Sequence, residues 1–112
     1  MKRLVLLVAV GIPALFLLSS ALLGAADITA GKEAYLKKCA NCHGQAGEGK
    51  DAIAQMLKIK FIPLGSKEVQ SKNDAELKKI PLEGKGKMNA VKDLNDQMIE
   101  DIIAFVRTLA KK

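Results

Sequence analysis

The side chains best suited to chemistry stand in one short segment, Cys39-Ala40-Asn41-Cys42-His43. Two cysteines separated by two residues and followed directly by a histidine form the attachment pattern of a c-type haem. On a turn of helix, the two thiols reach the vinyl groups of neighbouring pyrroles while the imidazole falls beneath the iron. The segment predicts one covalent haem c, bonded through Cys39 and Cys42, with His43 as an axial ligand of the iron.

Three other interpretations of the cysteine pair compete with haem attachment. A thioredoxin-type dithiol favours the start of a helix after a strand, whereas we expect this pair at the end of a helix. A zinc site needs four ligands, and the chain has two cysteines and one histidine, so an acidic residue would have to complete it. A disulfide across only two residues stabilises little and leaves His43 without a role.

The second axial ligand must come from another part of the chain, and the methionines after residue 26 are Met56, Met88 and Met98. Met98 falls on the apolar face of the last expected helix, where methionine usually packs. Met56 lies in an apolar stretch that we expect at the haem edge. Met88 ends the segment Gly84-Lys85-Gly86-Lys87-Met88, whose glycines allow the backbone to approach the porphyrin closely. We predict Met88 as the ligand, with Met56 as the main alternative.

The first 26 residues differ in composition from the rest of the chain. Met1-Lys2-Arg3 is basic, an uncharged apolar run follows from Leu4 to Leu18, and Gly24-Ala25-Ala26 suits signal peptidase. We predict a cleaved export signal over residues 1–26 and a haem-binding domain over residues 27–112. The alternative is an uncleaved anchor, because residues 4–26 carry no charge and approach the roughly 20 residues of a spanning helix. Either way we expect a periplasmic domain, free or anchored to the inner membrane.

Basic residues outnumber acidic ones in this chain of 112 residues, 18 against 12, which gives a formal charge of +6. Without Lys2 and Arg3 the balance is 16 against 12, or +4. Every remaining cation except Arg107 is a lysine, a hydrated point charge suited to fast, salt-sensitive encounters with an acidic protein surface. Aromatic residues are scarce, so nucleic acid is not expected as a partner. The docking candidates are Lys50, Lys58, Lys60, Lys85, Lys87 and Lys92.

The first part of the domain is expected to hold a helix and the wall of a pocket. The helix should start near residue 28, with Asp27 or Thr29 as its N-cap, and run towards Cys39. After the haem motif, a glycine-bearing loop leads into an apolar stretch that should line the haem pocket. Its members are Ala52, Ile53, Met56, Leu57, Ile59, Phe61 and Ile62.

Three further helices complete the expected all-α domain. Ser66 and Asn73 are each placed to cap a short helix, the second over residues 74–80 before Pro81 stops it. The last helix should open at Asn95 and close on the two C-terminal lysines. One of its faces is apolar at spacings of three and four, which indicates core: Met98, Ile102, Phe105, Val106 and Leu109.

The sequence resembles the class I, single-haem bacterial cytochromes c over residues 27–112. The matching segments agree in order and spacing, and they are Gly31-Lys32 with Tyr35, residues 39–44, residues 84–88 and residues 103–109. The resemblance implies an all-α fold in which the first and last helices cross, with Gly31, Tyr35 and Phe105 at the crossing. It also implies that one histidine and one methionine bind the iron.

The chain departs from that family at two places near the haem. The family often has proline directly after the ligand methionine and an aromatic soon after, whereas Asn89 and Val91 stand there. These residues leave two interpretations open: a softer loop would make Met88 more labile, or Asn89 would hydrogen-bond near the sulfur and alter the reduction potential. Many members also orient the histidine with a proline carbonyl, and here only Pro63, which lies well downstream, is a candidate.

A histidine and a methionine together fill both axial positions of the iron. We therefore expect a monomeric single-electron carrier and not an enzyme, with a membrane oxidase, a reductase or a cytochrome bc complex as its redox partner. One alternative is a ligand-binding or weakly catalytic haem protein with a labile sixth ligand. The other is an anchored cytochrome subunit of a larger oxidoreductase.

Overall fold

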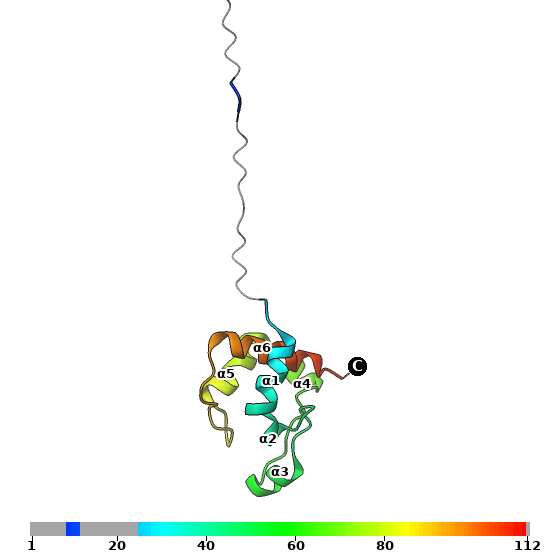
Figure 1. Ribbon diagram of the computed structural model, residues 1–112. Coiled ribbons are helices and arrows are strands. Elements are labelled where there is room, and N and C mark those ends of the chain that lie inside the picture. Colours follow the sequence, from blue (N-terminus) through cyan, green and yellow to red (C-terminus); the bar gives the residue numbers. More distant parts are fainter. Residues whose placement is uncertain (1–8, 12–24, 112) are drawn as a thin grey trace, which may run out of the picture.

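Six α-helices make up most of the chain that the computed structural model describes, which comprises residues 9–11 and 25–111 (Figure 1). No strand forms in these residues, and one isolated β-bridge joins Lys85 to Met88. The all-α fold predicted from the sequence is confirmed. The helices are α1 (Ile28–Lys38), α2 (Ala40–His43), α3 (Asp51–Leu57), α4 (Lys67–Gln70), α5 (Asp74–Glu83) and α6 (Asp96–Thr108).

Most of the predicted leader, residues 1–26, lies outside the described residues, so the leader stays a prediction. Its last two residues, Ala25 and Ala26, are exposed and belong to no helix. Asp27 follows as the N-cap of α1. Within the described part of the chain, none of the helices has the length and the apolar character of a membrane span.

The main packing contact of the domain is the crossing of α1 and α6 (Figure 1). Gly31 marks the closest approach, because a β-carbon there would lie 1.9 Å from the backbone oxygen of Asp101. One turn later, Tyr35 is fully buried, and its ring centroid lies 5.1 Å from that of Phe105, with the planes tilted by 54°. The predicted crossing is confirmed. It fixes the C-terminal end of α1, where the haem motif begins.

The core lies along α6 in two clusters. One gathers around Tyr35 and Phe105 of the crossing, and the other joins α6 to Val69 of α4 and Leu77 of α5. The apolar face of α6 is wider than the predicted stripe, because the helix packs against α1 on one side and against α4 and α5 on the other. The buried apolar residues of α6 are Ile99, Ile102, Ile103, Phe105 and Val106, whereas Met98 and Leu109 are half-buried.

The two short helices begin where the sequence predicts. The Ser66 side chain caps α4, and Asn73 forms a capping box at the start of α5. The predicted stop at Pro81 is wrong, because α5 continues through it to residue 83. Pro81 lies in the last turn, where its missing N–H removes one helical bond only, and the Gly84 N–H still donates to the Ile80 carbonyl at 2.7 Å.

The last helix begins as predicted and ends earlier than predicted. The Asn95 side chain accepts a hydrogen bond from the Met98 N–H at 2.8 Å, which caps α6. The helix ends at Thr108 and not at the C-terminal lysines. The backbone turns away there because the Lys111 N–H donates to the Gly65 carbonyl at 3.0 Å.

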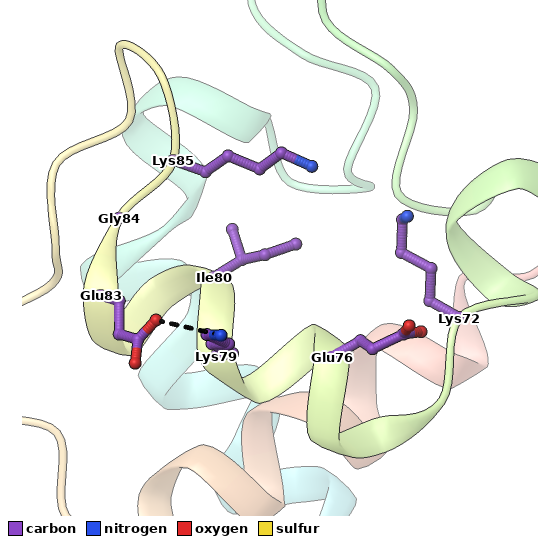
Figure 2. Close-up of a pocket in the computed structure, with 7 residues that line it drawn as sticks. All are labelled: Lys72, Glu76, Lys79, Ile80, Glu83, Gly84 and Lys85. Carbon is purple, nitrogen blue, oxygen red and sulfur yellow. Dashed lines mark ion pairs between the residues drawn. The ribbon is translucent and has the colours of Figure 1, made fainter.

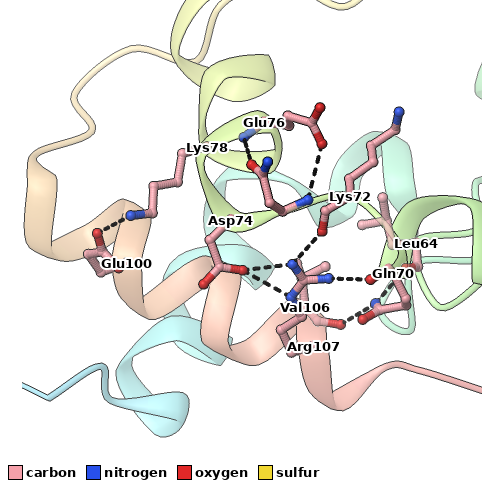
Figure 3. Close-up of polar contacts among 10 residues, drawn as sticks. Leu64, Gln70, Lys72, Asp74, Glu76, Lys78, Glu100, Val106 and Arg107 are labelled. Atoms are coloured by element: carbon pink, nitrogen blue, oxygen red, sulfur yellow. Dashed lines mark hydrogen bonds and ion pairs between the residues drawn. The ribbon is translucent and has the colours of Figure 1, made fainter.

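Arg107 ties α6 to the segment between α4 and α5 (Figure 3). Its guanidinium donates to the carbonyls of Gln70 at 2.8 Å and Lys72 at 2.7 Å, and to the Asp74 carboxylate at 2.7 Å. The Gln70 side-chain amide in turn donates to the Leu64 carbonyl at 2.8 Å. The planar guanidinium reaches three acceptors at once, which a lysine ammonium in the same place would not match.

Candidate haem-binding site

The haem motif lies at the junction of α1 and α2. Cys39 is both the C-cap of α1 and the N-cap of α2, and the His43 N–H donates to the Cys39 carbonyl at 2.9 Å. The Tyr35 hydroxyl donates to the Gly44 carbonyl at 2.6 Å, which ties the end of α2 to the buried face of α1. Burial raises the pKa of Tyr35 to about 12, so this donor keeps its proton. One helical turn thus carries the second thiol and the imidazole.

The cysteines do not have the surroundings of a redox or zinc site. Both thiols are free, with Cys39 half-buried and Cys42 exposed. Burial raises the pKa of Cys39 to about 11, whereas a reactive dithiol needs a lowered pKa. Among the described residues, no group of three or more His, Cys, Asp or Glu side chains could hold a metal ion. The dithiol, disulfide and zinc interpretations therefore find no support.

Two adjoining cavities open beside the motif, and Cys39, His43 and Met88 line both of them. The outer cavity has a volume of about 590 Å³ and the inner one about 90 Å³. Cofactor and small-molecule sites commonly measure roughly 300–1,000 Å³. The inner cavity is otherwise lined by Tyr35, Leu64, Leu77, Ile80, Pro81, Ile102, Ile103 and Val106.

An apolar wall formed by α3 and the residues after it closes one side of the outer cavity. In Figure 1, α3 lies at the end of the domain away from α6, and it has no buried residue. Met56 and Ile62 are 68% and 47% exposed. The side chains that line the cavity from this segment are Ile53, Met56, Leu57, Ile59, Phe61 and Ile62. The predicted pocket lining is confirmed, except that Ala52 does not line the cavity.

The residues of the two cavities fit a haem. A wall of exposed apolar side chains facing a cavity is stabilised when a large apolar group packs against it. Two thiols and an imidazole stand at the edge of the same space, where they can bond to such a group and to its iron. The donor set and the apolar lining therefore agree on one cofactor.

His43 is held neutral in the wall of this space. Burial lowers its pKa, and the neutral imidazole is the form that binds a metal. The ring of Phe61 lies against it edge-on, with centroids 5.4 Å apart. Its Nδ1 atom is buried without a hydrogen-bond partner. The Pro63 carbonyl accepts from the Ser66 N–H at 3.0 Å and makes no hydrogen bond with His43, so the structure does not support this candidate as the group that orients the imidazole.

Met88 reaches the cavities on a tight loop after α5. Lys85 and Met88 exchange two backbone hydrogen bonds of 2.9 Å each. Gly84 has a φ of 81°, and a β-carbon on it would lie 2.7 Å from the Met88 carbonyl oxygen, so glycine is required there. The Val91 N–H donates to the Pro81 carbonyl at 2.8 Å and anchors the far side of the loop. Backbone bonds therefore hold a loop that lacks the proline of the family pattern.

The three methionines differ in the cavities that they line. Met88 lines both cavities, together with His43. Met56 lines the outer cavity only. Met98 lines neither cavity and is half-buried on α6. The two ligands predicted from the sequence thus share one space, although they come from α2 and from the loop after α5.

Lysines gather around the outer cavity. The ammonium group of Lys87 donates to the Leu57 carbonyl at 2.6 Å, and that of Lys38 to the Lys92 carbonyl at 3.2 Å. The lysines that line the cavity are Lys38, Lys60, Lys85 and Lys87. Within residues 25–111, none of these four pairs with a carboxylate. The docking candidates Lys50, Lys58 and Lys92 do not line it, and the sequence reasoning missed Lys38, which directly precedes the motif.

A third cavity, of about 340 Å³, lies along α5 (Figure 2). Lys79 forms an ion pair with Glu83, with an N···O distance of 3.8 Å. Figure 2 shows this pair, with the side chains of Lys72 and Lys85 on either side of Ile80. Its lining offers no thiol, imidazole or thioether. Because Ile80 also lines the inner cavity, one side chain stands between this charged cavity and the haem site.

The fold and the site define a small helical domain that holds a covalent c-type haem. The family model described as cytochrome C oxidase, cbb3-type, subunit III matches residues 26–106, so the chain belongs to this family. No curated protein matches the chain. The domain is a class I monohaem cytochrome c that binds covalent haem c and transfers electrons, with redox partners in an oxidase or respiratory context. The predictions of the family and of the cofactor are confirmed.

Proposed function

We propose that this cytochrome is an exported, monomeric single-electron carrier of the periplasm, in which Cys39 and Cys42 hold the haem and His43 and Met88 bind its iron. The observation that carries the proposal is that His43 and Met88 line the same two cavities from separate elements. An imidazole and a thioether are an established axial pair for electron-transfer haem.

The ligand pair explains why a carrier is favoured over an enzyme. When bound, the haem supplies a single-electron couple between ferric and ferrous iron. The neutral imidazole of His43 and the thioether of Met88 can stay in place in both states. Because His43 and Met88 would both bind the iron, they would leave no open site on it for oxygen or a substrate.

The apolar inner cavity supports a raised reduction potential. Leu64, Leu77 and Ile102 line the space next to His43 and Met88 with apolar side chains. An apolar surrounding disfavours the extra positive charge of the oxidised centre. A methionine ligand acts in the same direction.

Carbon monoxide binding by the reduced holoprotein tests the ligand pair. Wild type should bind the gas slowly at neutral pH, because Met88 has to leave the iron first. Met88→Ala should bind it rapidly, whereas Met56→Ala, the matched control at the cavity wall, should behave like wild type. Rapid binding by the wild-type protein would contradict the proposed ligation and favour the ligand-binding alternative.

The unpaired lysines around the outer cavity support docking to an acidic partner surface. They would raise the encounter rate at low salt, and the Debye length falls from about 30 Å at 0.01 M to about 10 Å at 0.1 M. The electron-transfer rate with an acidic partner should therefore fall as salt is added. Lys60→Gln with Lys85→Gln should flatten this dependence, and Lys67→Gln on α4, away from the cavity, should not. A rate that is independent of salt in wild type would refute electrostatic docking.

A second candidate function is a cytochrome subunit of a larger oxidase, and the description of the matched family favours it. An uncleaved leader would then anchor the domain to the membrane. Cell fractionation separates the two candidates. A free carrier should stain for haem in the soluble periplasmic fraction, and an anchored subunit should stay with the membranes after a high-salt wash.

A further inference from the structure

Asp101 is a buried acid whose charge has no cationic partner in the described residues. Its side chain lies on α6 with 7% of the residue exposed. Its Oδ1 accepts hydrogen bonds from the backbone nitrogen of Asp27 at 2.8 Å and from the Gln97 amide at 2.9 Å. Both donors are neutral in the uncut chain, and none of the ion pairs found in residues 25–111 includes Asp101. Buried carboxylates are rare without a charged partner.

The Asp27 nitrogen is held in a fixed place above Asp101. Asp27 is the N-cap of α1, and its own carboxylate accepts from the Thr29 and Ala30 N–H groups at 2.9 and 3.1 Å. One turn further along α1, Gly31 lies against the Asp101 backbone at the closest point of the helix crossing. The crossing therefore brings this nitrogen to Asp101 across 74 residues of sequence.

We propose that the chain is cut between Ala26 and Asp27 and that the new α-ammonium group of Asp27 forms an ion pair with buried Asp101. The inference rests on the proposed function, because export brings the leader to signal peptidase. Hydrolysis of this peptide bond consumes one water: the carbonyl carbon becomes the Ala26 carboxylate, and the nitrogen leaves as the α-amine of Asp27. That amine takes up a proton near neutral pH.

The position of the cut agrees with the structure. Ala25 and Ala26 are exposed and non-helical, whereas Asp27 is the N-cap of α1, so a cut between Ala26 and Asp27 leaves the folded domain whole. A cut at this bond converts a neutral amide donor into a charged one. Charge-assisted hydrogen bonds are roughly twice as strong as neutral ones. Maturation thus gives Asp101 a cationic partner, which it lacks among residues 25–111 of the uncut chain.

The helix dipole of α1 opposes the ion pair and is outweighed. The N-terminus of a helix carries about half a positive charge, which repels an ammonium group. The Asp101 carboxylate accepts directly from this nitrogen at 2.8 Å, and its full negative charge at hydrogen-bond distance exceeds the half charge of the helix end. The pair therefore fastens the start of α1 to α6, next to the crossing that positions the haem motif.

The intact mass of the full chain, matured in a bacterial host that attaches c-type haem, tests the cut. The inference predicts a chain of residues 27–112, and the haem is read separately as an added mass. Haem on a chain that starts elsewhere, or that keeps its leader, overturns the inference and leaves the carrier function standing. A chain that starts at Asp27 without haem contradicts the proposed function instead.

A double-mutant cycle on the holoprotein tests the ion pair. Asp101→Asn is made in the chain that starts at Asp27 and in a chain with one additional alanine before it, each start being verified by mass. The substitution should raise the unfolding equilibrium constant roughly fivefold more in the first chain than in the second. Glu33→Gln, an exposed acid of α1, should have equal effects in both. If Asp101→Asn changes the unfolding equilibrium constant equally in the two chains, the proposed ion pair is overturned.

Titration of the α-amine in the wild-type protein tests the ion pair independently, in case Asp101→Asn does not fold. The ordinary pKa of an α-amine is about 7.7–8.0. Among the described contacts, Asp101 is the titratable group bonded to this nitrogen, and the carboxylate of Asp27 itself accepts from Thr29 and Ala30. Followed by NMR, the α-amine should titrate above its ordinary range, and titration at or below that range overturns the ion pair.

Discussion

Replacement of Gly31 by alanine should force apart the two helices that position the haem motif. The new β-carbon would lie 1.9 Å from the backbone oxygen of Asp101 and 2.4 Å from its carbonyl carbon. An ordinary contact of this kind is at least 3.4 Å, so the helices would have to separate by 3.4 − 1.9 = 1.5 Å. Because the opposing atoms are backbone, no change of rotamer can relieve the clash.

The cost of Gly31→Ala should be large for a domain of this size. Overpacking typically costs about 1–3 kcal/mol where side chains can yield. The higher helix propensity of alanine offsets part of this cost, by about 1 kcal/mol. Since a backbone contact has to open, we expect a net loss of about 3 kcal/mol. At about 4–8 °C per kcal/mol, the Tm should fall by at least about 12 °C.

Thermal unfolding of the holoprotein measures this effect. Lys32→Ala, at the exposed neighbouring position, is the matched control and should change stability by no more than about 0.5 kcal/mol. A Tm of Gly31→Ala equal to or above that of wild type would refute the reasoning. Helix propensity would then outweigh the crossing contact, and α1 and α6 could not lie as close as described.

Three further predictions concern the supports of the site. Tyr35→Phe should lose about 1–3 kcal/mol of stability, because a buried carbonyl loses its donor. Burial raises the pKa of Tyr35 from 10.0 to about 12, so the contribution of its hydroxyl to the free energy of unfolding is complete below pH 10 and is lost as the pH rises through 12. Urea titrations at several pH values should show this loss in wild type and not in Tyr35→Phe. Arg107→Lys should cost about 1–3 kcal/mol in the same assay, because a planar fork with three acceptors is replaced by a point charge. In a Cys39→Ala, Cys42→Ala variant without haem, hydrogen exchange should show fast exchange first in α3, which has no buried residue.

Local signals in the sequence were sufficient for the starts of α1, α4, α5 and α6 and for the haem motif, but not for α3, whose N-cap residue makes no side-chain hydrogen bond. Asp27, Asn73 and Asn95 cap their helices through hydrogen bonds that span only two or three residues, so their types and positions already indicate them. The spacing of Cys39 to His43 is local in the same way. These features depend on chain geometry within one turn.

Helix ends and long-range polar contacts could not be predicted in the same way. The rule that proline stops a helix failed at Pro81. This residue lies in the last turn of α5, where a missing hydrogen bond costs little. The early end of α6 depends on a bond from Lys111 to Gly65, far away in the sequence. The pairing of Asp27 with Asp101 likewise exists only after the helices cross.

The site was predicted best where its residues carry distinctive chemistry. Met88 was favoured for its glycine-rich loop, and the structure brings it to the cavity of His43. Lys38 was missed because nothing in the sequence distinguishes a lysine that lines the cavity from one elsewhere on the surface. Pro63 was considered for its carbonyl, which accepts from the Ser66 N–H and makes no hydrogen bond with His43.

The optical spectrum of the oxidised holoprotein tests the central claim most directly. A thioether bound to ferric haem iron gives a weak sulfur-to-iron absorption band. We predict that wild type shows this band, that Met88→Ala loses it and that Met56→Ala keeps it. Absence of the band from wild type, or its survival in Met88→Ala, would contradict the assignment of His43 and Met88 as the ligand pair of an electron carrier.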